Sequence, residues 1–173
     1  MQGQRPRRKA YLDDFKPDAA GHYVYCGTTL AFYGTNEERR RFRFCFGLCC
    51  AVILAAEIAA GCLNVGTLDN TMLVLIPYML QIVFAAAFLW AGGRLVFAGD
   101  PLRAYVHRQT VQRLPILAVI LAVCAGATCI CAVIALILQK SANAASIVYL
   151  LLFFAVCAAA LCARAAIRKV HWK

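Results

Sequence analysis

The sequence predicts an all-α integral membrane protein, a bundle of four transmembrane helices arranged as two antiparallel hairpins, with both termini in the cytoplasm. Three observations support this prediction: an apolar composition, four apolar segments of membrane-spanning length, and a one-sided distribution of lysine and arginine. Of the 173 residues, 63% are hydrophobic and 15% are charged, and the mean hydropathy is +0.71. A soluble domain of this length could not bury so much apolar surface, so the composition excludes that class.

Four segments are long and apolar enough to cross a bilayer. A helix needs about 20 apolar residues to span the hydrocarbon, because backbone polar groups cannot remain unpaired in lipid. The predicted spans are Phe44–Leu63, Met72–Gly93, Leu114–Leu138 and Ser146–Ala163. They form a transmembrane domain at 44–163 that contains a cytoplasmic loop at 94–113. A cytoplasmic segment at 1–43 precedes this domain, and a basic cytoplasmic tail at 164–173 follows it.

The basic residues predict the orientation of the bundle. All but one of the 18 lysines and arginines lie before the first span, between the second and third, or after the fourth, and Lys140 is the exception. Because such residues are retained in the cytoplasm, both termini are predicted on the cytoplasmic side of a plasma membrane. Beside an anionic inner leaflet each cation contributes about 1 kcal/mol, so the charge indicates lipid contact and not a nucleic-acid partner. The residues expected to contact anionic lipid are Arg39, Arg40, Arg41, Arg43, Arg103, Arg108, Arg164, Arg168 and Lys169.

Short elements are predicted outside the spans. Tyr11–Pro17 is expected to form a helical turn that ends at its proline, and the alternation in His22–Tyr33 is typical of a β-hairpin. Thr35 and Glu38 have the spacing of a capping box, so the first helix should begin before the membrane. Asp100–Pro101 predicts the start of an interfacial amphipathic helix in the loop.

Glu57 is the only acid in the middle of a predicted span, and an intramembrane acid is by default a functional hypothesis. A charge at the helix centre costs roughly 2.5–3.5 kcal/mol, whereas each Leu, Ile, Phe or Val returns roughly 0.3–0.6 kcal/mol. The first span contains eight such residues, so it tolerates Glu57 only narrowly. Candidate partners at similar depth are Gln81 and Tyr78 in the second span and Tyr149 in the fourth.

Two interpretations of Glu57 remain open. In a transporter it would bind a proton or cation, and Pro77 would break the second helix and expose carbonyls nearby. As a structural residue, a protonated Glu57 would bond Gln81 or a backbone carbonyl and hold the first helix to the second. In that case Tyr78 and Tyr149 are expected in the outer aromatic belt.

Small residues recur at every fourth position in two spans, a spacing that lets helix backbones approach closely in lipid. We expect these stripes to pack inside the bundle, and an interface between copies of the chain is the alternative. The stripes consist of Gly47, Ala51, Ala55 and Ala59 in the first span and Ala118, Ala122 and Gly126 in the third.

The chain contains ten cysteines. Paired cysteines at the outer side would indicate a quinone-coupled thiol oxidase, but only Cys62 lies near the outer edge. Cys129 and Cys131 are two apart on a helix and point to different faces, which disfavours metal binding. We therefore expect the cysteines within the spans to serve as small packing residues.

No sequence motif supports catalysis: there is no nucleophile with a matched histidine and acid, no metal-spaced ligand set and no phosphate-binding glycine loop. We therefore expect no enzymatic activity, no cofactor and no metal. The predicted function is a scaffold or accessory subunit of a membrane complex, assembled with a membrane-protein partner or with further copies of the chain. The alternative is a small transporter or channel that uses Glu57 as its proton or cation site.

Overall fold

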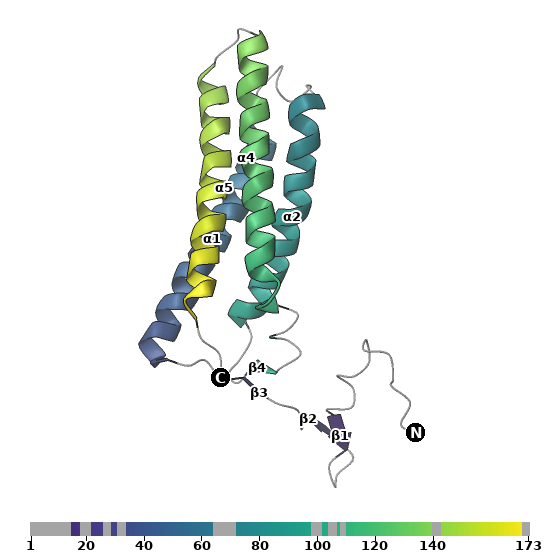
Figure 1. Cartoon of the computed structure of the whole chain (residues 1–173), viewed down its shortest axis with the longest axis vertical. Coiled ribbons are helices and arrows are strands. Elements are labelled where there is room, and N and C mark those ends of the chain that lie inside the picture. The colour runs from purple at the N-terminus through teal and green to yellow at the C-terminus, as the bar shows by residue number, and fades with distance from the viewer. Residues whose placement is uncertain are drawn as a thin grey trace.

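The computed structural model describes residues 15–17, 22–25, 29–30, 34–63, 72–97, 102–103, 107, 110–139 and 143–170. Four long helices dominate it: α1 (Asn36–Cys62), α2 (Met72–Phe97), α4 (Leu114–Gln139) and α5 (Ala144–Arg168). All four are long and apolar enough to cross a membrane, and they pack as a bundle (Figure 1). The predicted all-α bundle with four candidate spans is therefore confirmed.

The helices form a ring in which α1 lies beside α5, α5 beside α4, α4 beside α2, and α2 beside α1. Three of these seams are extensively packed, but α1 and α2 touch much less, although they are consecutive spans. In Figure 1, α1 runs obliquely behind the other helices. The α1–α2 seam is therefore the most sparsely packed side of the ring.

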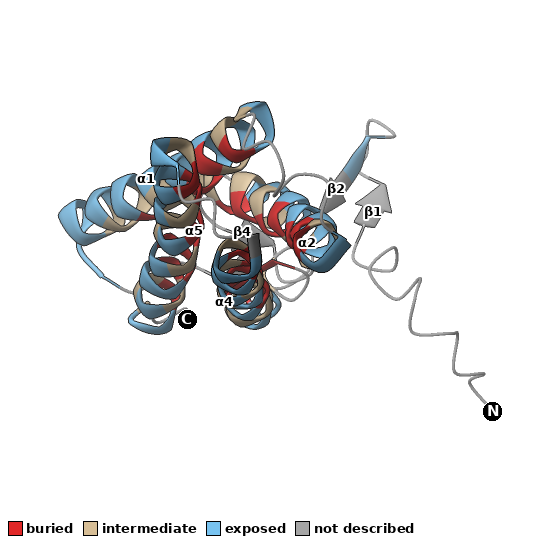
Figure 2. Cartoon of the chain, turned by 90° about the horizontal axis from the view of Figure 1, so that it is seen from above, coloured by how far each residue is buried: buried red, intermediate tan, exposed pale blue. Residues whose placement is uncertain are grey.

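The buried residues of each helix form a stripe that faces the centre of the bundle, and the outer faces are exposed (Figure 2). Toward one end, Phe46 on α1 packs against Phe88 on α2, with ring centroids 6.0 Å apart. Toward the other end, Tyr149 and Phe153 on α5 pack edge to face at 4.5 Å. Large apolar side chains cover the outer faces, as expected for helices whose solvent is lipid.

A capping box begins α1, as its sequence spacing predicts. The Thr35 hydroxyl accepts from the Glu38 amide at 3.2 Å, and the Glu38 carboxylate accepts from the Thr35 amide at 2.9 Å. These bonds satisfy two of the amides that a helix start otherwise leaves unpaired. The helix therefore begins before the predicted span and includes the arginine run within its first turns.

The short strands differ from the predicted elements. β1 (Phe15–Pro17) pairs antiparallel with β2 (Tyr23–Tyr25), where a helical turn was expected at the first of these segments. β3 (Thr29–Leu30) pairs antiparallel with β4 (Leu102–Arg103). β2 and β3 therefore pair with strands outside the expected hairpin and not with each other. A strand, β4, also lies where the amphipathic helix was expected to start. The hairpin prediction is wrong because an alternating pattern indicates a strand without identifying the strand it pairs with. The helical turn was predicted from Pro17, but a proline is also acceptable at the end of a strand. The remainder of these predicted elements lies outside the described residues.

The predicted internal stripe of α1 is wrong. Ala51 and Ala55 are exposed on the outer face, and a Cβ placed on Gly47 would meet nothing within 4 Å. The helix instead buries the adjacent small pair, Ala56 and Ala60, which are 5% and 3% exposed. Neighbouring alanines thus offer two overlapping stripes about 100° apart around the helix, and the spacing alone cannot choose between them.

The stripe of α4 is internal in part. Ala118 and Ala122 are buried, as predicted. Gly126 is half-buried, and a Cβ on it would again meet nothing within 4 Å.

Candidate functional site

The candidate polar site lies in the α1–α2 seam, in the half of the bundle away from the arginine run. Glu57 is about 21 Å along α1 from Arg43, at 1.5 Å per residue. On α2, Tyr78 and Gln81 are three residues apart and therefore share the face that turns inward. Both are buried, Gln81 completely, whereas Glu57 is half-buried.

The structure joins Glu57 to Gln81, one of the partners expected from the sequence. The Gln81 Nε2 donates to Glu57 Oε1 at 2.7 Å. The Tyr78 hydroxyl donates to the backbone carbonyl of Glu57 at 3.3 Å, a longer and weaker contact. Two side chains of α2 therefore hold the same residue of α1, where the helices otherwise touch little.

Each member of the pair retains a buried oxygen with no hydrogen-bond partner among the described residues. These atoms are Oε2 of Glu57 and Oε1 of Gln81. Both are acceptors when the carboxyl group is ionised, so neither can satisfy the other. A proton on the carboxyl group would turn one acceptor into a donor, and a bound cation or water would serve both. The pair therefore has the composition of a site that takes up a proton or a small cation.

Tyr149, the other candidate partner, contacts Tyr78. The two rings meet edge to face with centroids 6.4 Å apart, and Phe153 packs against Tyr78 at 5.6 Å. Tyr78 and Tyr149 are 8% and 2% exposed, so the expectation that they lie in an outer aromatic belt is wrong. Aromatic rings at a membrane interface would be exposed, whereas these form part of the core.

A pocket of about 260 Å³ opens beside Tyr78 at the same end of the bundle. It is lined by residues of α1, α2 and α5, including Gly61, Tyr78 and Tyr149. A Cβ on Gly61 would lie 3.2 Å from the Tyr78 hydroxyl oxygen, so this glycine permits the close approach of the ring. Tyr78 therefore touches both the pocket and the backbone of Glu57.

Packed side chains lie on the opposite side of the polar pair. Ile53 and Ala56 on α1 and Ala85 and Phe88 on α2 are at most 5% exposed and belong to one apolar cluster. The pair is thus bordered by an aromatic side with a pocket and by a closed apolar side.

The basic residues gather at one end of the bundle, because α1 and α4 begin there while α2 and α5 end there (Figure 1). Within the four helices and the described residues that flank them, every lysine and arginine lies at this end. The predicted lipid-contact residues seen there are Arg39, Arg40, Arg41, Arg43, Arg164, Arg168 and Lys169. Arg103 is described only as part of β4, and Arg108 lies outside the described residues.

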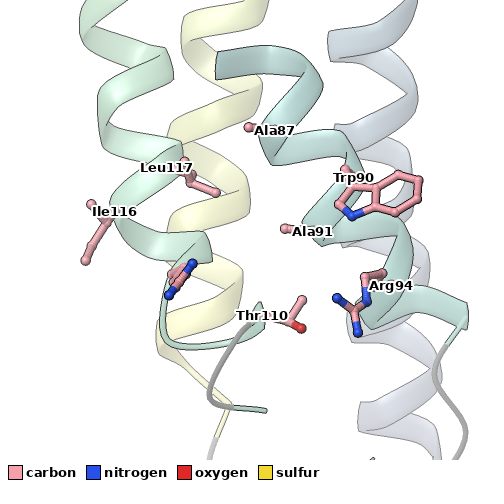
Figure 3. A pocket seen from close by; sticks show the side chains of 8 residues that line it. Ala87, Trp90, Ala91, Arg94, Thr110, Ile116 and Leu117 are labelled. Atoms are coloured by element: carbon pink, nitrogen blue, oxygen red, sulfur yellow. The ribbon is translucent and has the colours of Figure 1, made fainter. Parts of the chain in front are cut away.

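Arg94 and Arg113 were absent from the predicted contact set, although they line a pocket at this end (Figure 3). Each lies at a helix end, and Trp90 is one turn from Arg94. A tryptophan one turn inside a terminal arginine is a sequence signal that could have identified this position.

The described cysteines are all free thiols. No group of three or more histidine, cysteine or acidic residues gathers among the described residues to hold a metal ion. Comparison with protein-family models, with curated proteins and with solved structures found no match to this chain.

Proposed function

We propose that the protein is a non-catalytic scaffold or accessory subunit of a plasma-membrane complex, oriented with its basic end and both termini in the cytoplasm. The observation that carries this proposal is the outer face of α1. Ala51 and Ala55 are exposed there beside Gly47, although lipid-facing positions need no small residues. Small residues four apart allow another transmembrane helix to approach closely, which favours a helix of a partner protein on this face.

The limited burial of α1 also supports this proposal. In the most apolar 18-residue stretch of α1, 22% is buried, compared with 33% in the corresponding stretches of α4 and α5. Helix α1 therefore has the largest share of surface left for a further helix. The cations at the basic end hold the subunit against the anionic leaflet while α1 makes the partner contact.

The test replaces the small residues with large ones. Ala51→Leu with Ala55→Leu should abolish recovery of a stoichiometric membrane-protein partner after extraction into lipid nanodiscs, because leucine prevents close helix approach. The matched control is Ala127→Leu with Ala158→Leu, at exposed alanines of α4 and α5. Light scattering gives the mass and mass spectrometry gives the composition.

A monomeric chain without a partner would contradict the proposal, as would equal loss in both double variants. Recovery of a dimer of the chain would show that the helix on this face comes from a second copy of the chain and not from a partner protein.

A small transporter or channel is the second candidate, favoured by the unpartnered oxygens of Glu57 and Gln81. In this function the carboxyl group takes up a proton or cation, and displacement of Tyr78 connects it to the neighbouring pocket. Glu57→Gln retains the shape and the amide contact but removes the titrating group. Proton-coupled flux into liposomes should then disappear while the unfolding free energy changes little. Flux that persists in Glu57→Gln would exclude this function.

A further inference from the structure

We propose that the pocket between α2 and the start of α4 binds one anionic glycerophospholipid, with the lipid phosphate on Arg94 and Arg113. The pocket has a volume of about 610 Å³. One wall is the last turns of α2, and the other is the segment that leads into α4 and its first turn. The binding site is independent of the polar pair at the other end of the bundle.

The charge of the pocket selects a phosphate. Among the residues that the structure describes, its lining includes two arginines and no acidic residue. Arginine remains protonated at any physiological pH, and its planar guanidinium group donates to two phosphate oxygens at once. In Figure 3 the Arg94 side chain extends toward Thr110 across the pocket, and Arg113 approaches from the α4 side. The pocket lining therefore carries one guanidinium group from α2 and one from the turn that precedes α4, and we place the phosphodiester between them.

Local backbone bonds hold Arg113 in position. Its amide donates to the Thr110 carbonyl at 3.2 Å, and its carbonyl accepts from the amides of Ile116 and Leu117 at 3.1 and 3.0 Å. Thr110 itself is buried, with 1% of its surface exposed. The cation therefore lies on a short rigid turn that continues directly into α4.

The depth of the pocket matches the headgroup layer. Arg94 lies in the last turn of α2, and Trp90 lies one turn, about 6 Å, further into the bundle. Trp90 is 75% exposed, and an exposed indole on a transmembrane helix is typical of the boundary between headgroups and hydrocarbon. The two arginines are thus expected at the level of lipid phosphates.

An apolar floor distinguishes a lipid from a free phosphate. Ala87 and Ala91, four residues apart on α2, and Ile116 and Leu117 on α4 form the apolar part of the pocket lining. This floor extends from the arginines toward the hydrocarbon, and it fits the first part of an acyl chain. A free phosphate would make no contact with it, so the shape favours a phospholipid.

The experiment measures lipid retention by native mass spectrometry on the full chain in detergent. The lipids are dioleoyl phosphatidylglycerol and dioleoyl phosphatidylcholine, added at equal concentration. The wild type should retain the anionic lipid preferentially, and Arg94→Gln with Arg113→Gln should weaken its binding about 30-fold, at about one tenfold step per 1.4 kcal/mol. The control, Arg41→Gln with Arg168→Gln, removes the same charge from exposed residues outside the pocket lining. These two residues are expected to contact the leaflet surface, which is absent in detergent, so their loss should change retention of the one bound lipid by about twofold or less.

Two further arms separate the sources of the phosphate and test the floor. Inorganic phosphate at millimolar concentration should leave the bound phosphatidylglycerol in place, because it lacks an acyl chain. Ala87→Leu, within the pocket, should weaken lipid binding while Ala86→Leu, at an exposed position outside the lining, should not. Equal retention of both lipids, equal losses in the two arginine double variants, or displacement by inorganic phosphate would each overturn the proposal.

Discussion

Replacing Gln81 with leucine tests whether the buried polar pair links α1 to α2. Leucine has nearly the volume of glutamine, so the change removes the 2.7 Å hydrogen bond to Glu57 without opening a large cavity. It leaves both carboxyl oxygens of Glu57 without a donor from this side chain. An unsatisfied buried group costs about 1–3 kcal/mol in soluble proteins, whereas interhelical bonds in membranes couple by about 0.6 and at most about 1.7 kcal/mol. We therefore expect Gln81→Leu to lower the unfolding free energy by about 1–2 kcal/mol.

A double-mutant cycle separates the bond from its surroundings. Glu57→Leu with Gln81→Leu replaces both polar groups with apolar ones, so the double variant should recover part of the lost stability, with a coupling of about 0.6–1.7 kcal/mol. Unfolding in mixed micelles gives the free energies. The control is Thr128→Val, because the Thr128 hydroxyl bonds the Cys124 carbonyl at 2.9 Å within the same helix. If Gln81→Leu costs no more than this control and the coupling is zero, the pair does not link the helices.

Three further outcomes are expected. Gly92→Ala would bring a Cβ within 3.2 Å of the Phe46 ring and should lower the unfolding free energy by about 1–3 kcal/mol. The control Gly93→Ala meets nothing within 4 Å and should raise the unfolding free energy by up to about 1 kcal/mol. Similar unfolding free energies for the two variants would contradict this packing. Burial lowers the pKa of His107, so its protonation should destabilise the fold as the pH falls below about 6.5; an NMR titration with a pKa at or above that value would refute the burial. Cys26 should resist an impermeant maleimide in intact cells and react after lysis, and labelling from outside would reverse the proposed orientation.

Properties that depend on one segment at a time were predictable from the sequence. Hydrophobic length identified the four helices, because spanning a bilayer requires a nearly fixed number of apolar residues. The capping box at Thr35 was predictable because both of its bonds are local. The pairing of Glu57 with Gln81 was predictable because a buried carboxyl group needs a polar partner at its own depth, and few are present.

Properties that depend on how segments meet were not predictable. The pocket between Arg94 and Arg113 requires α2 and α4 to lie side by side, which helix periodicity does not specify. The sparse contact between α1 and α2 was likewise hidden, because consecutive spans with a short connection are expected to pack closely. The burial of Tyr149 followed from the aromatic cluster around Tyr78, although its position near a span end is typical of an interface.

The polar pair has a consequence for how α1 is oriented about its own axis. A rotation by one residue would replace the buried Ala56 and Ala60 with Ala55 and Ala59, which have the same size and shape. The alanines therefore do not distinguish the two orientations, whereas the fully buried Phe46 and Ile53 would be replaced by the smaller Cys45 and Val52. Only one orientation aims Glu57 at Gln81, and the other would turn the carboxyl group about 100° away from its amide partner. The polar contacts of Glu57 in the sparsely packed α1–α2 seam therefore act together with Phe46 and Ile53 to set which face of α1 the rest of the membrane encounters.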